Sequence, residues 1–202
     1  LYATYESSNQ ANLTQICQDH YQKARDAFKQ LLRKVETPLK KSELRKRLTT
    51  HFDTQVELFR SSLKRFNQEE SFKLYIRELE ANMKGDMSTM ELQNSELLQQ
   101  VIANASAEAV TKCSHFLQEQ DQTEQGVGIE SLNKFKAEAV RTAQEFFEKK
   151  AGFAPEDYPM AGAARKGLEK ELQEVLNAHE VRNSERVERR TLKVSLSMSR
   201  EI

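Results

Sequence analysis

Apolar side chains recur at steps of three and four residues along almost the whole 202-residue chain. This spacing places them on one face of an α-helix, whereas a strand would need apolar and polar residues to alternate. The first stripe runs through Leu13, Ile16, Cys17, Tyr21, Ala24, Phe28, Leu31 and Leu32. Only six glycines and three prolines interrupt the pattern, and the 31% of residues that are charged supply solvated faces. We therefore expect an all-α fold of long amphipathic helices.

Breaks between the stripes predict six helices. Thr37-Pro38 suits a helix start, Asn67 with Glu70 forms a capping-box pattern, and Ser88 with Glu91 forms another just after Gly85. The expected helices cover residues 8–35, 38 to near 67, 70 to about 84, 88 to before Gly126, 129–150, and about 164–190. Beyond Arg190, alternating apolar residues are consistent with either a strand or a frayed helix end.

Six one-sided helices with short connections must bury their stripes against one another. We expect an elongated antiparallel bundle of about six helices, arranged as two three-helix units in tandem over residues 1–85 and 86–202, within one continuous helical domain. An internal sequence similarity supports two units. The segments 20–34 and 58–71 resemble the segments 139–150 and 172–185, in that order.

Charge and composition limit the cellular compartment and the binding partners that we expect for this chain. Lysine plus arginine equals aspartate plus glutamate at 31 each, so no global field would attract nucleic acid. The sequence holds no apolar run long enough to span a bilayer and no secretory leader, which predicts a soluble, cytoplasmic chain. Cys17 and Cys113 lie on apolar stripes, so we expect buried free thiols rather than a disulfide.

The sequence predicts no catalytic, cofactor-binding or metal-binding residues. The histidines are His20, His51, His115 and His179. They are scattered on four of the expected helices, and none has a glutamate three residues before it, as a di-iron bundle would require. Gly126-Val127-Gly128 lacks the third glycine and the preceding strand of a dinucleotide-binding loop.

Two segments remain as candidate sites. A basic docking patch around the first interhelical turn would contact phosphates, an anionic lipid surface or an acidic partner, unless it is only a solvated bundle end; its members are Arg33, Lys34, Lys40, Lys41, Arg45, Lys46 and Arg47. The second is AGFAPEDYPMAG, residues 151–162, which we interpret as a connector between two helices, either a hinge or a fixed elbow. Its candidate residues are Gly152, Pro155, Pro159 and Gly162.

Four stretches stand out: YATYESSNQANLTQICQDHYQKA, VELFRSSLKRFNQEES, EAVRTAQEFFEKKAGFAPEDY and KELQEVLNAHEVRNSE. Together they resemble the helical middle and C-terminal region of the guanylate-binding protein and atlastin branch of dynamin-like large GTPases. The resemblance implies a non-catalytic stalk or effector domain that follows a GTPase domain outside this sequence, where GTP and Mg²⁺ would bind. The chain opens on Leu1, which fits a piece of a longer protein.

The resemblance implies that the upstream GTPase domain is a partner of this chain. It leaves open whether the chain forms a homodimer and whether other segments contact a membrane. The chain departs from atlastins by lacking membrane spans and from prenylated guanylate-binding proteins by lacking a terminal Cys-a-a-X. The alternative is a free-standing spectrin-like scaffold for protein interactions, against which stand the absence of tryptophan and the uneven helix lengths.

Overall fold

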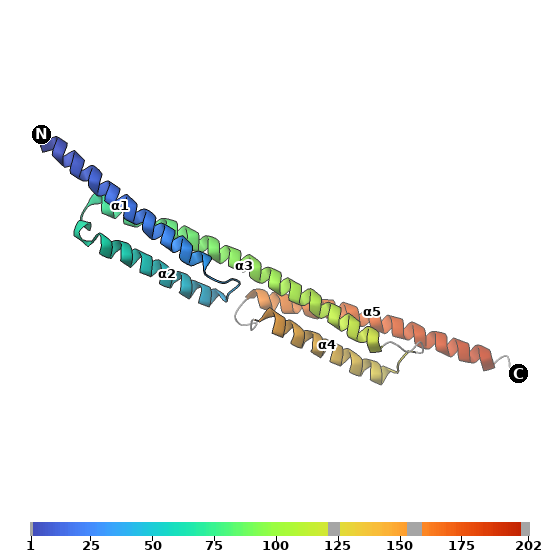
Figure 1. The fold of residues 1–202 in the computed structure, drawn as a ribbon. Coiled ribbons are helices and arrows are strands. Elements are labelled where there is room, and N and C mark those ends of the chain that lie inside the picture. Colours follow the sequence, from blue (N-terminus) through green and yellow to red (C-terminus); the bar gives the residue numbers. More distant parts are fainter. Residues whose placement is uncertain (1, 121–125, 153–158, 199–202) are drawn as a thin grey trace. The chain divides into compact units, whose positions relative to one another are not determined.

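The computed structural model describes residues 2–120, 126–152 and 159–198. These residues form five α-helices and one 3₁₀ turn, with no strand among them. The helices are α1 (Tyr2–Arg33), α2 (Lys41–Ser62), α3 (Glu70–Gln120), α4 (Ile129–Ala151) and α5 (Pro159–Met198), and the 3₁₀ turn is Lys64–Phe66 (Figure 1). The all-α prediction is confirmed.

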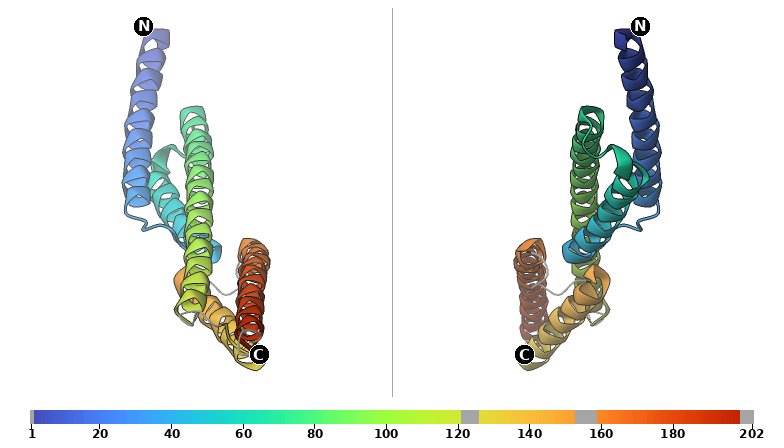
Figure 2. Two further views of the ribbon diagram at one scale, coloured as in Figure 1. Left: turned by 90° about the vertical axis from the view of Figure 1, so that its right-hand side faces the viewer. Right: turned by 90° about the vertical axis from the view of Figure 1, so that its left-hand side faces the viewer.

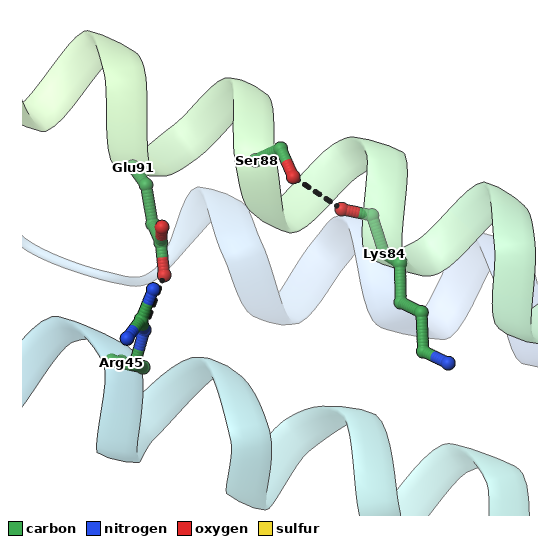
Figure 3. Close-up of polar contacts among 4 residues, drawn as sticks. All are labelled: Arg45, Lys84, Ser88 and Glu91. Atoms are coloured by element: carbon green, nitrogen blue, oxygen red, sulfur yellow. Dashed lines mark hydrogen bonds and ion pairs between the residues drawn. The ribbon is translucent and has the colours of Figure 1, made fainter.

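The prediction of six helices is wrong, because the two helices expected on either side of Gly85 are one helix of 51 residues, α3. A single glycine costs a helix interior only about 1 kcal/mol, which tertiary packing can offset. Ser88 and Thr89 do not cap a new helix; their hydroxyls donate to the carbonyls of Lys84 and Gly85, 3.0 and 3.1 Å away within the same helix. Figure 3 shows the first of these bonds.

Other helix ends also differ from the sequence reading. α2 begins at Lys41 rather than at Pro38, with Lys40 as the residue before its first turn. The expected break near Asn67 is present, and α3 starts at Glu70. The chain beyond Arg190 is not a strand: α5 continues to Met198, with the Thr191 hydroxyl donating to the Val187 carbonyl at 3.0 Å.

The chain divides into two compact units, Leu1–Leu98 and Gln99–Ile202. The division falls inside α3, whereas the sequence analysis placed it after residue 85. Unit 1 therefore consists of α1, α2 and the first part of α3, and unit 2 of the remainder of α3 with α4 and α5 (Figures 1 and 2). Within each unit the middle helix runs antiparallel to the other two.

All three helices of unit 1 contribute to its core. Phe28 of α1, Phe59 of α2 and Leu79 of α3 are almost fully buried. The remaining buried members of this cluster are Cys17, Ala24, Val56, Leu63, Phe72 and Met83. The rings of Phe59 and Phe72 stack with centroids 5.7 Å apart, which ties α2 to the start of α3.

Smaller side chains fill the core of unit 2. Its buried alanines are Ala105, Ala109, Ala139, Ala143 and Ala151. Cys113 and larger apolar residues are buried there too: Ile102, Leu117, Leu132, Phe147, Leu168, Leu172 and Leu176. No described helix is both long enough and apolar enough to cross a bilayer.

Candidate functional site

The predicted basic docking patch lies between the end of α1 and the second turn of α2. Arg33 is the last residue of α1, and Lys40 directly precedes α2. Lys40 is half-buried, and the other six residues are exposed. The structure thus places the patch on one stretch of unit 1 and leaves most of its cations accessible to solvent.

Two cations of the patch form ion pairs. Arg45 Nε lies 3.1 Å from Glu91 Oε1 and joins α2 to α3, as Figure 3 shows. Arg47 pairs with Glu43 one turn earlier on α2, at 2.6 Å. Because residues 45 to 47 are consecutive on a helix, their side chains leave it in different directions. The patch is therefore a spread of exposed charge rather than a convergent anion site, and its docking role stays a prediction.

A buried asparagine holds the loop that contains part of this patch. Asn94 on α3 is almost fully buried, and its carboxamide pairs with both backbone groups of Leu39. The Leu39 N–H donates to Asn94 Oδ1 at 2.7 Å, and Asn94 Nδ2 donates to the Leu39 carbonyl at 2.9 Å. The loop between α1 and α2 is thereby fixed to the third helix of its unit.

The same device recurs in unit 2. Asn183 on α5 is also buried, and it binds Val127 in the loop before α4. The Val127 N–H donates to Asn183 Oδ1 at 2.8 Å, and Asn183 Nδ2 donates to the Val127 carbonyl at 3.0 Å. We call these two pairs of bonds the asparagine clamps. Sequence reasoning missed both residues, although an asparagine on an apolar helical stripe is a usable signal because a buried amide needs partners.

The two clamps belong to an internal repeat. Asn94 and Asn183 are 89 positions apart, and the buried residues around them recur at 88 or 89 positions. The pairs include Phe28 with Leu117, Leu44 with Leu132, Phe59 with Phe147, Leu79 with Leu168, and Met83 with Leu172. The internal similarity proposed from the sequence pairs the wrong helices. It matched α1 with α4 and α2 with α5, whereas the structure matches α2 with α4.

The predicted connector is shorter than residues 151–162. Gly152 ends α4 in the left-handed conformation, with φ of 65°, and its N–H donates to the Glu148 carbonyl. Pro159 is the first residue of α5, a position that tolerates the missing N–H of proline. Gly162 lies inside α5 and is not part of the connector, and Pro155 lies outside the described residues.

The histidines and cysteines do not converge. Among the described residues no group of three or more His, Cys, Asp or Glu side chains is placed to hold a metal ion. Cys17 and Cys113 are buried free thiols, which confirms the expectation from the sequence. Burial raises the pKa of both thiols, with a further contribution from Glu69 at Cys17, so the reactive thiolate is disfavoured.

Comparison of the chain with protein-family models, with curated proteins and with solved structures finds no match. The geometry of the described residues comprises two three-helix units, each with an asparagine clamp, and an exposed basic stretch on unit 1.

Proposed function

We propose that this chain is a non-catalytic stalk or effector segment of a large GTPase of the guanylate-binding protein or atlastin kind. In this proposal the segment relays a GTP-driven rearrangement of an upstream domain to membrane tethering or self-assembly. The stretches quoted above support the family. GTP and Mg²⁺ would bind in the upstream domain, which would also be the first partner of the basic docking patch.

The main support for a relay of movement is that the two units are joined by helical backbone. Their division falls between Leu98 and Gln99, inside α3, and no turn separates them. A loop would leave freely rotating dihedrals at the join, whereas each residue of a helix is held by the hydrogen-bond ladder. Such a join favours transmission of a movement along the chain.

The asparagine clamps support the same proposal. A relay requires each unit to move as a body, and each clamp fixes the first loop of its unit to the third helix with two hydrogen bonds to buried amide groups. Loops without such bonds would open at little cost in free energy.

A second candidate is a free-standing helical scaffold for protein interactions. The internal repeat favours it, because stacked copies of one helical unit are the way in which scaffolds extend. The two candidates differ in one respect that can be measured, which is whether nucleotide binding elsewhere in the protein changes the position of these units.

The test uses the full-length protein with two pairs of distance labels. The first pair joins the upstream domain to Lys46, an exposed residue of α2, and the control pair joins Lys46 to the exposed Glu78 of α3 within unit 1. We expect a non-hydrolysable GTP analogue to change the first distance and leave the second unchanged. If GTP does not bind, or binds without changing the first distance, the relay is wrong and the scaffold is the better account.

A further inference from the structure

The buried stripe of α5 continues beyond the clamp of unit 2 as an exposed stripe. Up to the clamp, Leu172, Leu176 and Asn183 are buried. The next positions at three-four spacing are Val187, Thr191 and Val194. Val187 is 41% exposed and Val194 is 50% exposed, so apolar surface that would normally be covered faces solvent.

The internal repeat shows that the matching stripe of α3 is buried. Beyond Asn94, the stripe of α3 continues through Ile102 and Ala105, which are only 3% and 2% exposed. Ala105 and Val194 are 89 positions apart, the spacing that relates the two clamps. Ile102 and Ala105 belong to the part of α3 that falls in unit 2, together with α4 and α5. In α3 the stripe is therefore buried, whereas in α5 it is exposed.

The exposed stripe of α5 forms one wall of an open groove of about 380 Å³. The residues that line it are Gly126, Val127, Gly128, Val187, Arg190, Thr191, Val194 and Ser195. The loop before α4 approaches α5 closely at Gly126, where a Cβ would lie 2.9 Å from Val187 Cγ2. With two glycines in the opposite wall, the groove presents backbone and small side chains beside the apolar stripe.

A row of basic residues accompanies the stripe. Arg186, Arg190 and Lys193 follow one another at three-four spacing, which places them along one side of it. A second copy of the chain would bring the same basic row, and like charges disfavour that pairing. A helix with carboxylates beside its apolar stripe would complement both features.

We propose that residues 187–194 of α5, together with the loop residues 126–128, form a docking groove for an amphipathic helix of another protein, one whose apolar stripe is flanked by aspartate or glutamate. The partner helix covers Val187 and Val194, whose counterparts in α3, Leu98 and Ala105, are buried. Its carboxylates lie along Arg190 and Lys193. The proposal goes beyond the relay function and does not depend on a GTPase domain.

The probe is a fluorescent helical peptide of about 20 residues, roughly 30 Å long, with leucines at three-four spacing and glutamates beside them. A matched peptide carries lysine in place of each glutamate. Binding to the full chain is measured by fluorescence anisotropy at low and at physiological salt. The docking variant is Val194→Asp, and the matched control is Val181→Asp, since Val181 is also exposed on α5 but lies outside the stripe.

We expect the glutamate peptide to bind with a dissociation constant in the micromolar range, about −8 kcal/mol. Val194→Asp should weaken binding at least about tenfold, about 1.4 kcal/mol, while Val181→Asp leaves it unchanged. The double variant Arg190→Glu/Lys193→Glu should reverse the preference toward the lysine peptide.

Three results would overturn the proposal. One is no binding of the glutamate peptide to the unsubstituted chain. Another is equal loss of binding in Val194→Asp and Val181→Asp, which would point to a nonspecific effect of the added charge. The third is concentration-dependent self-association, measured by sedimentation, that Val194→Asp abolishes; the occupant of the groove would then be a second copy of this chain.

Discussion

The two units close their first loop in the same way but fill their cores with side chains of different size. Each unit has an asparagine clamp from its third helix. In the core, however, Phe28 of unit 1 corresponds to Leu117 of unit 2, and Leu63 corresponds to Ala151. Because each buried methylene contributes about 0.8 kcal/mol, unit 1 gains more from burial at these positions. The two units thus have the clamp at the same position, although the volume of their core side chains differs.

Replacing the paired phenylalanines gives the largest expected effect. Phe59→Ala and Phe147→Ala each remove a buried ring, and such changes cost about 3–5 kcal/mol. Phe59 should lie at the upper end, because its ring also stacks on Phe72. Urea unfolding gives the total cost, and hydrogen exchange followed residue by residue shows which unit opens. Protection lost equally in both units after either substitution would show that the units do not open separately.

Breaking the clamps comes next. Asn94→Ala removes the two hydrogen bonds that Leu39 makes with Asn94, and Asn183→Ala removes the two that Val127 makes with Asn183, at an expected cost of about 1–3 kcal/mol each. Faster exchange of the loop amide itself, measured by NMR, should accompany the loss. As a control, Asn94→Asp keeps an acceptor for the Leu39 N–H but loses the donor and adds a buried charge. Unchanged exchange at Leu39 in Asn94→Ala would contradict the clamp.

Two glycines, one in each unit, should respond in opposite directions to alanine. Gly126 has φ of 71°, and an added Cβ would meet Val187 Cγ2 at 2.9 Å, so Gly126→Ala should destabilise by about 1–2 kcal/mol. Gly85 lies inside α3 with no atom within 4 Å of an added Cβ, so Gly85→Ala should stabilise by about 0.5–1 kcal/mol. Thermal unfolding compares the two variants. A destabilising Gly85→Ala would mean that α3 needs its glycine for a reason other than helix geometry.

The sequence predicted the class of fold because the apolar stripes are long and regular, but it could not predict how many helices carry them. Gly85 and the Ser88 capping pattern are local signals for a break, and local signals do not show that Met83 and Leu98 are buried on one continuous helix. Glu91, expected to complete the capping box, instead pairs with Arg45 on another helix. Tertiary contacts thus override a short-range motif.

The candidate site was predictable only in part. The basic docking patch is exposed, as its sequence indicates, because charged residues without partners are rarely buried in a core. The clamps were not predicted, since an asparagine's partners here lie 55 and 56 positions away in loops. The correct repeat was missed for a related reason: charged and aromatic helix ends resemble one another by composition, while the true spacing is carried by single buried residues such as Phe59 and Phe147.

The smallest expected effect concerns a matched pair of interhelical ion pairs. Glu91 and Glu180 are 89 positions apart, and each binds a cation of the middle helix of its unit: Arg45 at 3.1 Å and Lys136 at 2.6 Å. The hydrogen bond from Lys136, together with its charge, lowers the pKa of Glu180 below the usual glutamate value. The folded state therefore binds fewer protons at Glu180 than the unfolded state does. The stabilisation is present above the ordinary pKa of glutamate and is lost as the pH falls through the lowered value.

The expected result is that Glu180→Gln removes a small part of the acid dependence of stability, seen as a smaller drop in unfolding midpoint between neutral pH and about pH 3. Because Glu180 is exposed, added salt should screen the interaction and reduce the difference between the variant and the unsubstituted chain. Glu91→Gln serves as the matched variant in unit 1. If Glu180→Gln retains the full acid dependence at low salt, the Lys136 pair does not contribute to the stability of unit 2, and the two units share only their clamps and the positions of their buried residues.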